Sequence, residues 1–212
     1  MLRITDTGPR VVSVNVGVVQ AVEWRGRTVT TGIFKHAVAG RVALGGVNFH
    51  GDDQADRTVH GGPDKSVYAY ALEDYDAWRA AEGIATPAGL FGENLTVQGL
   101  DLSEAVIGQQ WRVGSAVLAI VQPRLPCFKL GIRMGDAQFP KRFLAMARTG
   151  AYLRIIQEGE VGAGDDVHVV DTPAHGVRLR DMVDAMHDPA KAAKLRRAPC
   201  LPKFWREVAE AR

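Results

Sequence analysis

Short hydrophobic runs separated by glycine-rich turns dominate the first 170 residues of the chain. In the first run Val14, Val16 and Val18 recur with a period of two, as on one face of a strand. Gly114 and Ser115 separate two other runs and predict a tight hairpin. The pattern predicts strands over residues 11–19, 66–71, 111–113, 116–121, 152–157 and 167–170. Many short strands with glycine turns favour a barrel or a sandwich over a doubly wound sheet.

Helical periodicity replaces this pattern at two places in the strand-rich part. One predicted helix covers residues 72–82 and is ended by Gly83. A second covers residues 138–148, with Phe139 and Phe143 on one face. The stretch 158–166 between the last two strands is rich in glycine and acidic residues, and we expect turns there.

The composition changes after about residue 175, where glycine nearly vanishes. Asp188 followed by Pro189 is typical of a helix start. We therefore predict a mainly β domain with α additions over 1–172 and a small helical domain over 173–212. The expected buried faces of the two longer tail helices consist of Leu179, Met182, Val183 and Met186, and of Phe204, Trp205 and Val208.

The overall charge excludes some classes of protein. Lys and Arg number 26 against 24 Asp and Glu, a net charge of +2, so no nucleic acid polymer is expected as a partner. No apolar stretch reaches the roughly 18 residues of a membrane span. The first ten residues carry no apolar core of a signal peptide, so we expect a cytoplasmic protein without a membrane partner. Two cysteines exclude a disulfide-stapled scaffold.

Three clusters could carry chemistry. The first, residues 56–66, places His60, Gly61, Gly62 and Lys65 just before a strand. Glycines allow backbone N–H groups to approach a phosphate or carboxylate, and a lysine adds positive charge. The spacing is not that of a Walker A loop. A plain glycine turn with a solvated lysine remains the alternative.

The second cluster, Glu93-Asn94, could present a carboxylate and an amide to a site, or form a surface turn. The third places Cys127 between Arg124 and Lys129, after two prolines. Nearby positive charge stabilises a thiolate, which is a nucleophile and a soft metal ligand. A buried structural cysteine is the alternative, and we expect Cys200 to be one.

Together these clusters resemble the MOSC family, named for the C-terminal domain of molybdenum cofactor sulfurases, and most of all its bacterial YiiM-like branch. The resemblance covers almost the whole chain, including a tail similar to that branch's three-helix domain. It implies a MOSC-type β-barrel, of the pyruvate-kinase-like kind, that binds the molybdenum cofactor (molybdopterin). The segments that carry it are 11–17, 31–44, 56–70, 89–100, 107–135 and 148–165.

The resemblance also implies residue roles. Cys127 falls on the cysteine that ligates molybdenum in the family's reductases, which reduce N–O bonds of N-hydroxylated small molecules. His60 would join an anion-binding side, and Asp56 or Glu93 would relay protons. An external reductase would supply electrons, and the oligomeric state is left open. The residues expected to bind the cofactor are Gly61, Gly62, Lys65, Asn94, Arg124, Lys129 and Arg154.

Two rival functions fit the same residues. Cys127 could carry a persulfide in sulfur transfer, because an accessible thiolate suits that chemistry as well. The chain could also be a non-catalytic module that holds the cofactor. Bound molybdenum, sulfane sulfur on Cys127 and reduction of an N-hydroxylated compound would distinguish the three.

Overall fold

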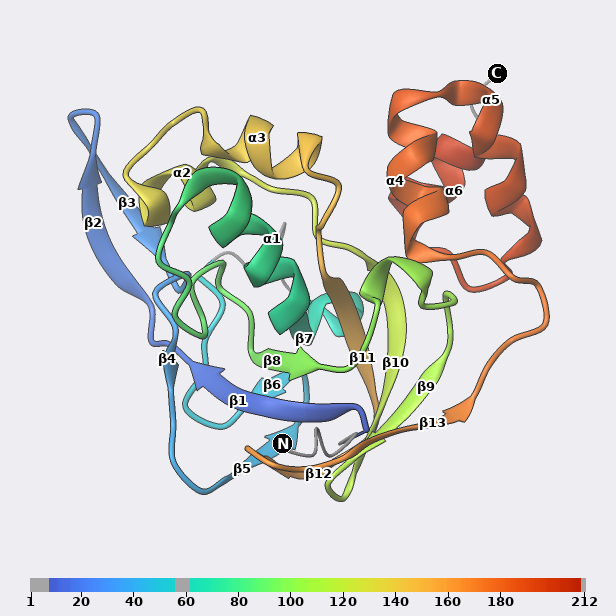
Figure 1. Ribbon diagram of the computed structural model, residues 1–212, viewed down its shortest axis with the longest axis horizontal. Coiled ribbons are helices and arrows are strands. Elements are labelled where there is room, and N and C mark those ends of the chain that lie inside the picture. Colours follow the sequence, from blue (N-terminus) through green and yellow to red (C-terminus); the bar gives the residue numbers. More distant parts are fainter. Residues whose placement is uncertain (1–7, 56–61, 211–212) are drawn as a thin grey trace, which may run out of the picture.

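One curled, mixed sheet forms the body of the molecule in the computed structural model, which describes residues 8–55 and 62–210. Its strands are β1 (Arg10–Val16), β4 (His36–Ala37), β7 (Val67–Ala71), β8 (Leu95–Gln98), β9 (Gln110–Val113), β10 (Ala116–Pro123), β11 (Ala151–Gln157) and β13 (Val167–Asp171). They follow the order β13-β9-β10-β11-β7-β8-β1-β4 (Figure 1). Only β7 and β8 run parallel among these pairs, and the connection between them contains helix α1 (Leu72–Glu82).

The sheet curls towards a barrel without closing as one. β1 and β13 meet through a single bridge, Arg10 to Asp166, so no ladder joins them in the described parts of the chain. Strands β12 (Gly159–Gly162), β5 (Arg41–Gly45) and β6 (Asn48–Phe49) form a separate small sheet. The mainly β class with added helices is confirmed, whereas the expected closed barrel is not formed by strand pairing.

A hairpin of β2 (Gln20–Trp24) and β3 (Arg27–Thr31) projects from the body at the left of Figure 1. On the same side, α1 packs with α2 (Phe128–Met134) and α3 (Phe139–Ala145). Their shared core is aromatic and includes Tyr70, Tyr75, Trp78, Phe91, Phe139 and Phe143. Pairs of these rings lie at centroid distances of about 5 Å, which favours both stacked and edge-on packing.

The tail contains α4 (Leu179–His187), α5 (Pro189–Ala192) and α6 (Lys203–Glu210), with a 3₁₀ turn at Ala193–Arg197. Its buried residues belong to the same hydrophobic cluster as the sheet. The Trp205 indole N–H donates to Gln122 Oε1 of β10 at 3.0 Å. The tail is thus fastened to the sheet, and the domain boundary at residue 172 stays a prediction.

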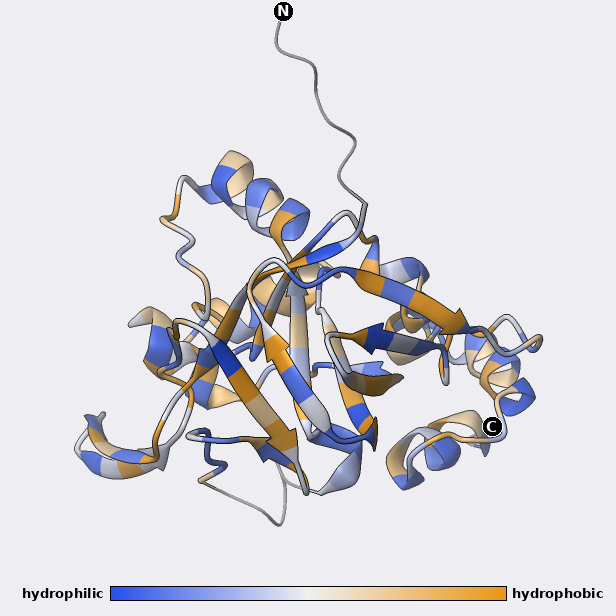
Figure 2. Cartoon of the chain, turned by 90° about the horizontal axis from the view of Figure 1, so that it is seen from below, coloured by the Kyte–Doolittle hydropathy of each residue, from blue (hydrophilic) through white to orange (hydrophobic). Residues whose placement is uncertain are grey.

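Several predicted elements agree with the structure. Helix α1 has the predicted bounds, and Gly83 ends it in the left-handed conformation at φ 66°. The hairpin β9–β10 turns at Gly114, whose φ is 57°. Asp188 caps α5 by accepting from the Ala190 N–H at 3.0 Å. Figure 2 shows hydrophobic and hydrophilic residues interleaved along the strands and the tail helices, as the sequence pattern requires.

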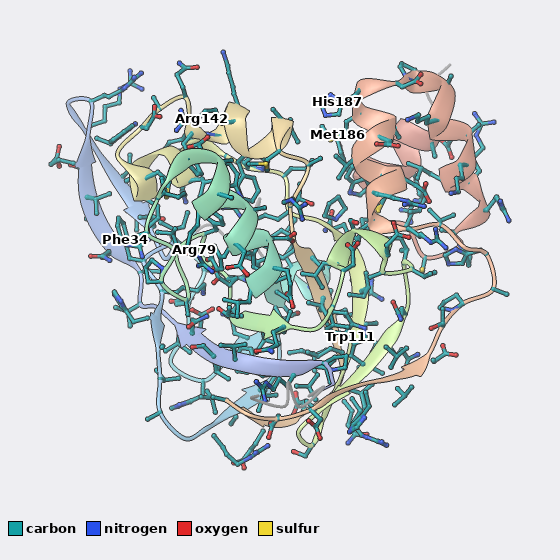
Figure 3. The ribbon with its side chains drawn as sticks, in the orientation of Figure 1. Phe34, Arg79, Trp111, Arg142, Met186 and His187 are labelled. Carbon is teal, nitrogen blue, oxygen red and sulfur yellow. The ribbon has the colours of Figure 1, made fainter. Side chains whose placement is uncertain are left out.

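Other predictions were wrong. The predicted helix 138–148 ends at Ala145, and Ala147 adopts a left-handed φ of 56°. The stretch 158–166 contains β12 rather than turns alone. Met186, labelled in Figure 3, and Phe204 are 39% and 48% exposed, so they lie off the buried faces. Among the described helices, none combines the length and the apolar character needed to cross a bilayer.

Candidate functional site

A cavity of about 100 Å³ lies where several segments of the chain meet. These are the end of β3 with the residues that follow it, residues 52–55, the 3₁₀ turn Pro63–Lys65, strands β7 and β11, the loop before β8, and the segment from the end of β10 to the start of α2. Five residues that we singled out from the sequence line it, and they are Lys65, Asn94, Arg124, Cys127 and Lys129. Three further charged residues of the wall, Lys35, Asp52 and Asp53, were not predicted.

The end of β10 delivers Cys127 to this cavity. The strand stops at Pro123, and the chain then runs through Pro126 to Cys127, which directly precedes α2. The fixed φ of proline limits the conformations of this stretch. Cys127 is half-buried, so its sulfur can meet a ligand in the cavity without being fully solvated.

Arg124 stands out in the cavity wall by its burial and its hydrogen bonding. The residue is only 6% exposed, and its guanidinium lies 5.4 Å from the ring centre of Tyr68 and 5.6 Å from that of Phe143. Its Nη1 is buried without a hydrogen-bond partner in the described structure. Leaving a buried charged donor unpaired is costly, so this atom calls for an acceptor from outside the described residues.

The charge of Arg124 is maintained despite its burial. Burial alone would lower the pKa of Arg124, but nearby Tyr68, Tyr152, Cys127 and Glu93 outweigh it, and the net pKa is raised. The cavity therefore keeps a permanent cation beside the cysteine.

Lys35 and Asp52 form a buried ion pair in the wall of the cavity. Their side chains are 8% and 1% exposed, and Nζ of Lys35 contacts Oδ1 of Asp52. Asp52 also accepts from the Gly17 N–H at 2.9 Å and from the Asn94 amide at 2.9 Å. Each carboxylate oxygen of Asp52 thus accepts from at least one donor of the protein.

Asn94 lines the cavity, but its side chain is engaged by the protein. Its Oδ1 accepts from the Tyr68 N–H at 3.1 Å, and its Nδ2 donates to Asp52 and to the Asn15 carbonyl at 3.3 Å. These bonds tie the residue to β7 and β1. The structure therefore places Asn94 as a support for Asp52 rather than as a free amide.

Glu93 lies away from the cavity in a fully buried position. It accepts from the Tyr75 hydroxyl at 2.7 Å, the Thr96 hydroxyl at 3.0 Å and the Gly89 N–H at 2.7 Å. Burial raises the pKa of Glu93, although these donors act against the rise. A carboxylate enclosed by structural donors holds the loop 89–93 in place, so the geometry does not support the predicted proton relay.

The remaining predicted residues are not at the cavity or lie outside the described residues. Arg154 is on β11 and pairs with Asp64, with Nε and Oδ1 at 3.0 Å, so it does not join the wall. Gly62 precedes the 3₁₀ turn with a φ of 91°, a conformation that favours glycine. Asp56, His60 and Gly61 lie outside the described residues.

A contact between Arg133 and Phe34 holds two walls of the cavity together. The Arg133 guanidinium lies 5.2 Å from the centre of the Phe34 ring, and its Nε donates to the Leu90 carbonyl at 3.1 Å. Figure 3 labels Phe34 near the base of the projecting hairpin. This packing fixes α2, and with it Cys127, against the segment that carries Lys35.

The described residues offer no group of three or more His, Cys, Asp or Glu side chains that could hold a metal ion. Cys127 is the soft donor of the cavity. The described part of the cavity wall therefore suits an anionic ligand that enters beside a cysteine.

Comparison with known proteins shows the family of the chain. A profile of the MOSC domain family matches residues 56–168. Protein YiiM of Escherichia coli (strain K12) is 30% identical over 188 residues, which cover 85% of this chain and 83% of that protein. A protein named Reductase from Gibberella moniliformis is 31% identical over 152 residues, 70% of this chain and 27% of that protein.

The crystal structure of YiiM from Geobacillus stearothermophilus has a similar fold, with a TM-score of 0.77 and 30% sequence identity. The match covers 95% of this chain and 97% of that one. The family profile includes the cavity residues from Lys65 to Tyr152, whereas residues 31–35 and 52–55 precede the matched range. The chain therefore belongs to the MOSC domain family, where it is similar to the YiiM proteins.

Proposed function

We propose that the cavity binds the molybdenum cofactor, with Cys127 as the protein's ligand to the metal, and that the protein reduces N–O bonds of N-hydroxylated small molecules. MOSC domains are generally associated with this cofactor. The relative named Reductase favours reduction over a purely binding role.

The observation that carries the proposal is the unpaired Nη1 of Arg124 in the wall that also contains Cys127. The cofactor bears a phosphate and a pterin ring with acceptor atoms, so it offers what this donor lacks. It also brings most of its metal ligands with it. A single cysteine then suffices, which fits a cavity without a cluster of metal-binding side chains among the described residues.

The residues of the wall divide the binding task by charge. Lys65 and Lys129 line the cavity with Arg124 and would neutralise an anionic cofactor. Tyr68 and Tyr152 supply aromatic surface that limits the access of water. Bound in this way, the cofactor would supply the two-electron chemistry of the metal.

The reaction needs electrons and protons that balance as R–NHOH + 2e⁻ + 2H⁺ → R–NH₂ + H₂O. The chain has two cysteines, too few for an iron–sulfur cluster held by four thiolates. We expect an external reductase to deliver the electrons, and water to be released from the cavity.

The test is the molybdenum content of protein made in a host that produces the cofactor. We expect about one metal per chain in the wild type, loss of the metal in Cys127→Ala, and retention in Cys200→Ala. Contrary to the burial expected from the sequence, Cys200 is exposed in the tail. It does not line the cavity, so it is the matched control. Elemental analysis measures the metal, and reduction of an N-hydroxylated purine by reduced methyl viologen measures the activity.

Other results would favour the rival functions. Absence of metal from all three proteins, with sulfane sulfur on Cys127, would replace the proposal by sulfur transfer. Stoichiometric molybdenum without reduction of any N-hydroxylated compound would leave a module that holds the cofactor.

A further inference from the structure

Arg124, Lys65 and Lys129 can supply the positive charge that holds an anionic cofactor. The buried pair of Lys35 and Asp52 is not needed for that task. Lys35 is largely neutralised by Asp52, yet both side chains line the cavity. A buried ion pair contributes little to stability compared with apolar residues of the same size, so its place in a cavity wall points to chemistry.

Three glycines allow the chain to bring Lys35 to this position. A Cβ atom on Gly17 would lie 2.7 Å from the Phe34 carbonyl oxygen, and one on Gly89 would lie 2.8 Å from that of Lys35. A Cβ atom on Gly92 would lie 2.8 Å from Ile33 Cγ1. Residues 33–35 therefore pack directly against the backbone of these glycines, where a larger residue would clash. This close packing holds Lys35 in place.

We propose that Lys35 donates a proton to the oxygen that leaves the N-hydroxylated substrate, and that Asp52 is the positioning residue for its ammonium group. This inference rests on the reductase function proposed above. As the N–O bond breaks, an Nζ–H bond of Lys35 breaks and an O–H bond forms on the departing oxygen. The two electrons come from the external reductase, and water supplies the second proton and reprotonates Lys35.

The electrostatic surroundings suit a proton donor. Burial lowers the pKa of Lys35, and the opposing effects of Asp52, Glu93 and Asp53 do not fully offset it. Arg124 is the other buried cation of the wall and remains charged. A lysine with a lowered pKa gives up its proton more readily than a solvated lysine. The contact between its Nζ and Oδ1 of Asp52 fixes the orientation of the ammonium group.

The test compares Lys35→Arg with the wild type, and with Lys141→Arg on the exposed face of α3 as the matched control. Arginine keeps the positive charge but stays protonated, so it cannot donate. With molybdenum-loaded protein, reduced methyl viologen and an N-hydroxylated purine, we expect kcat to fall about 100-fold in Lys35→Arg. KM and molybdenum content should stay unchanged, and the decline of kcat at high pH should disappear.

A second variant covers the case in which arginine does not fit. Asp52→Asn keeps Lys35 but removes the carboxylate that raises its pKa, so the high-pH decline of kcat should move to lower pH. In cofactor-free protein, NMR of the lysine Nζ groups should show the same downward shift. This readout does not depend on the loaded enzyme.

The outcomes separate the two proposals. A loaded wild type that reduces the purine, together with a fully active Lys35→Arg, overturns the role of Lys35 alone. Loss of molybdenum in proportion to activity in Lys35→Arg also overturns it, because the lysine would then hold the cofactor. A loaded but inactive wild type overturns the proposed function and this inference with it.

Discussion

Four charged side chains in or near the cavity are buried, and they differ in their hydrogen-bond partners. Asp52 is surrounded by donors, Lys35 is paired with it, Glu93 is enclosed by a loop, and Arg124 keeps an unpaired nitrogen. The first three are satisfied within the protein, so they shape the cavity. Arg124 is the group whose hydrogen bonding an incoming ligand would complete, which is why the proposed function rests on it.

Gly89 provides a test of how tightly the Lys35 segment is packed. Gly89 and Gly26 both have positive φ, 79° and 74°, so alanine strains the backbone at either position. That strain costs roughly 1–2 kcal/mol. A Cβ atom on Gly26 meets nothing within 4 Å, whereas one on Gly89 lies 2.8 Å from the Lys35 oxygen. We expect Gly89→Ala to lower the free energy of unfolding by about 1–3 kcal/mol more than Gly26→Ala.

Urea denaturation of both variants measures this difference. Equal losses for the two variants would mean that residues 33–35 can move away from Gly89, and the argument for a firmly held Lys35 would fail.

At the scale of elements, some local signals were read correctly from the sequence, whereas pairing between distant segments was not. Gly83 ends α1 in the left-handed backbone conformation, which glycine adopts readily. A glycine at the end of a helical pattern is a signal that the sequence itself contains. β12 was missed because its residues, Gly-Glu-Val-Gly, have no strand periodicity and are held by pairing with β5. Partners so distant in sequence leave no local pattern.

The same limit applies to the candidate site. Cys127, Arg124 and Lys129 lie within six residues of one another, so their cluster is visible in the sequence. Lys35 and Asp52 are separated by 17 residues and meet only in the fold. Their pairing depends on glycines and on Asn94 from other elements, which no spacing rule reports.

Helix α6 offers a prediction at this scale. Phe204 and Trp205 are neighbours, and successive side chains on a helix point about 100° apart. Trp205 is fully buried, whereas Phe204 is 48% exposed. We expect Trp205→Ala to reduce the free energy of unfolding by about 3–5 kcal/mol. Phe204→Ala, the control, should cost about 0.5 kcal/mol.

Thermal or urea unfolding of the two variants measures both effects. A loss in Phe204→Ala that matches the loss in Trp205→Ala would contradict the orientation of α6 described above.

At the scale of the whole molecule, a few polar contacts draw the two ends of the curled sheet together. Arg41 of β5 binds Asp165 through both nitrogens, at 2.8 and 2.9 Å. The Gly162 N–H donates to the same carboxylate at 2.9 Å. Asp165 itself lies beside β1, because its carbonyl accepts from the Val11 N–H at 2.8 Å. One carboxylate thus connects the small sheet to the place where β1 and β13 meet.

This carboxylate gives a pH dependence with a definite sign. Partial burial would raise the pKa of Asp165, but the Arg41 and Gly162 donors outweigh it and lower the pKa below the ordinary 3.8. The stabilisation is therefore complete above about pH 4–5 and is lost as the pH falls through the lowered pKa. Asp165→Asn should show a shallower loss of stability below pH 4.

Urea midpoints measured between pH 2 and 6 test this, with Asp171→Asn on the exposed end of β13 as the control for a lost charge. An acid limb as steep in Asp165→Asn as in the wild type would assign the pH dependence to other carboxylates.

The bond between Trp205 and Gln122 has a consequence for the order of synthesis. Gln122 lies two residues before Arg124 on the strand that leads to Cys127, and its support comes from the last helix. A ribosome makes the chain from its N-terminus, so all cavity residues exist before that support is translated. The strand that leads to Cys127 therefore gains this hydrogen bond only after α6 has been translated and has packed against the sheet.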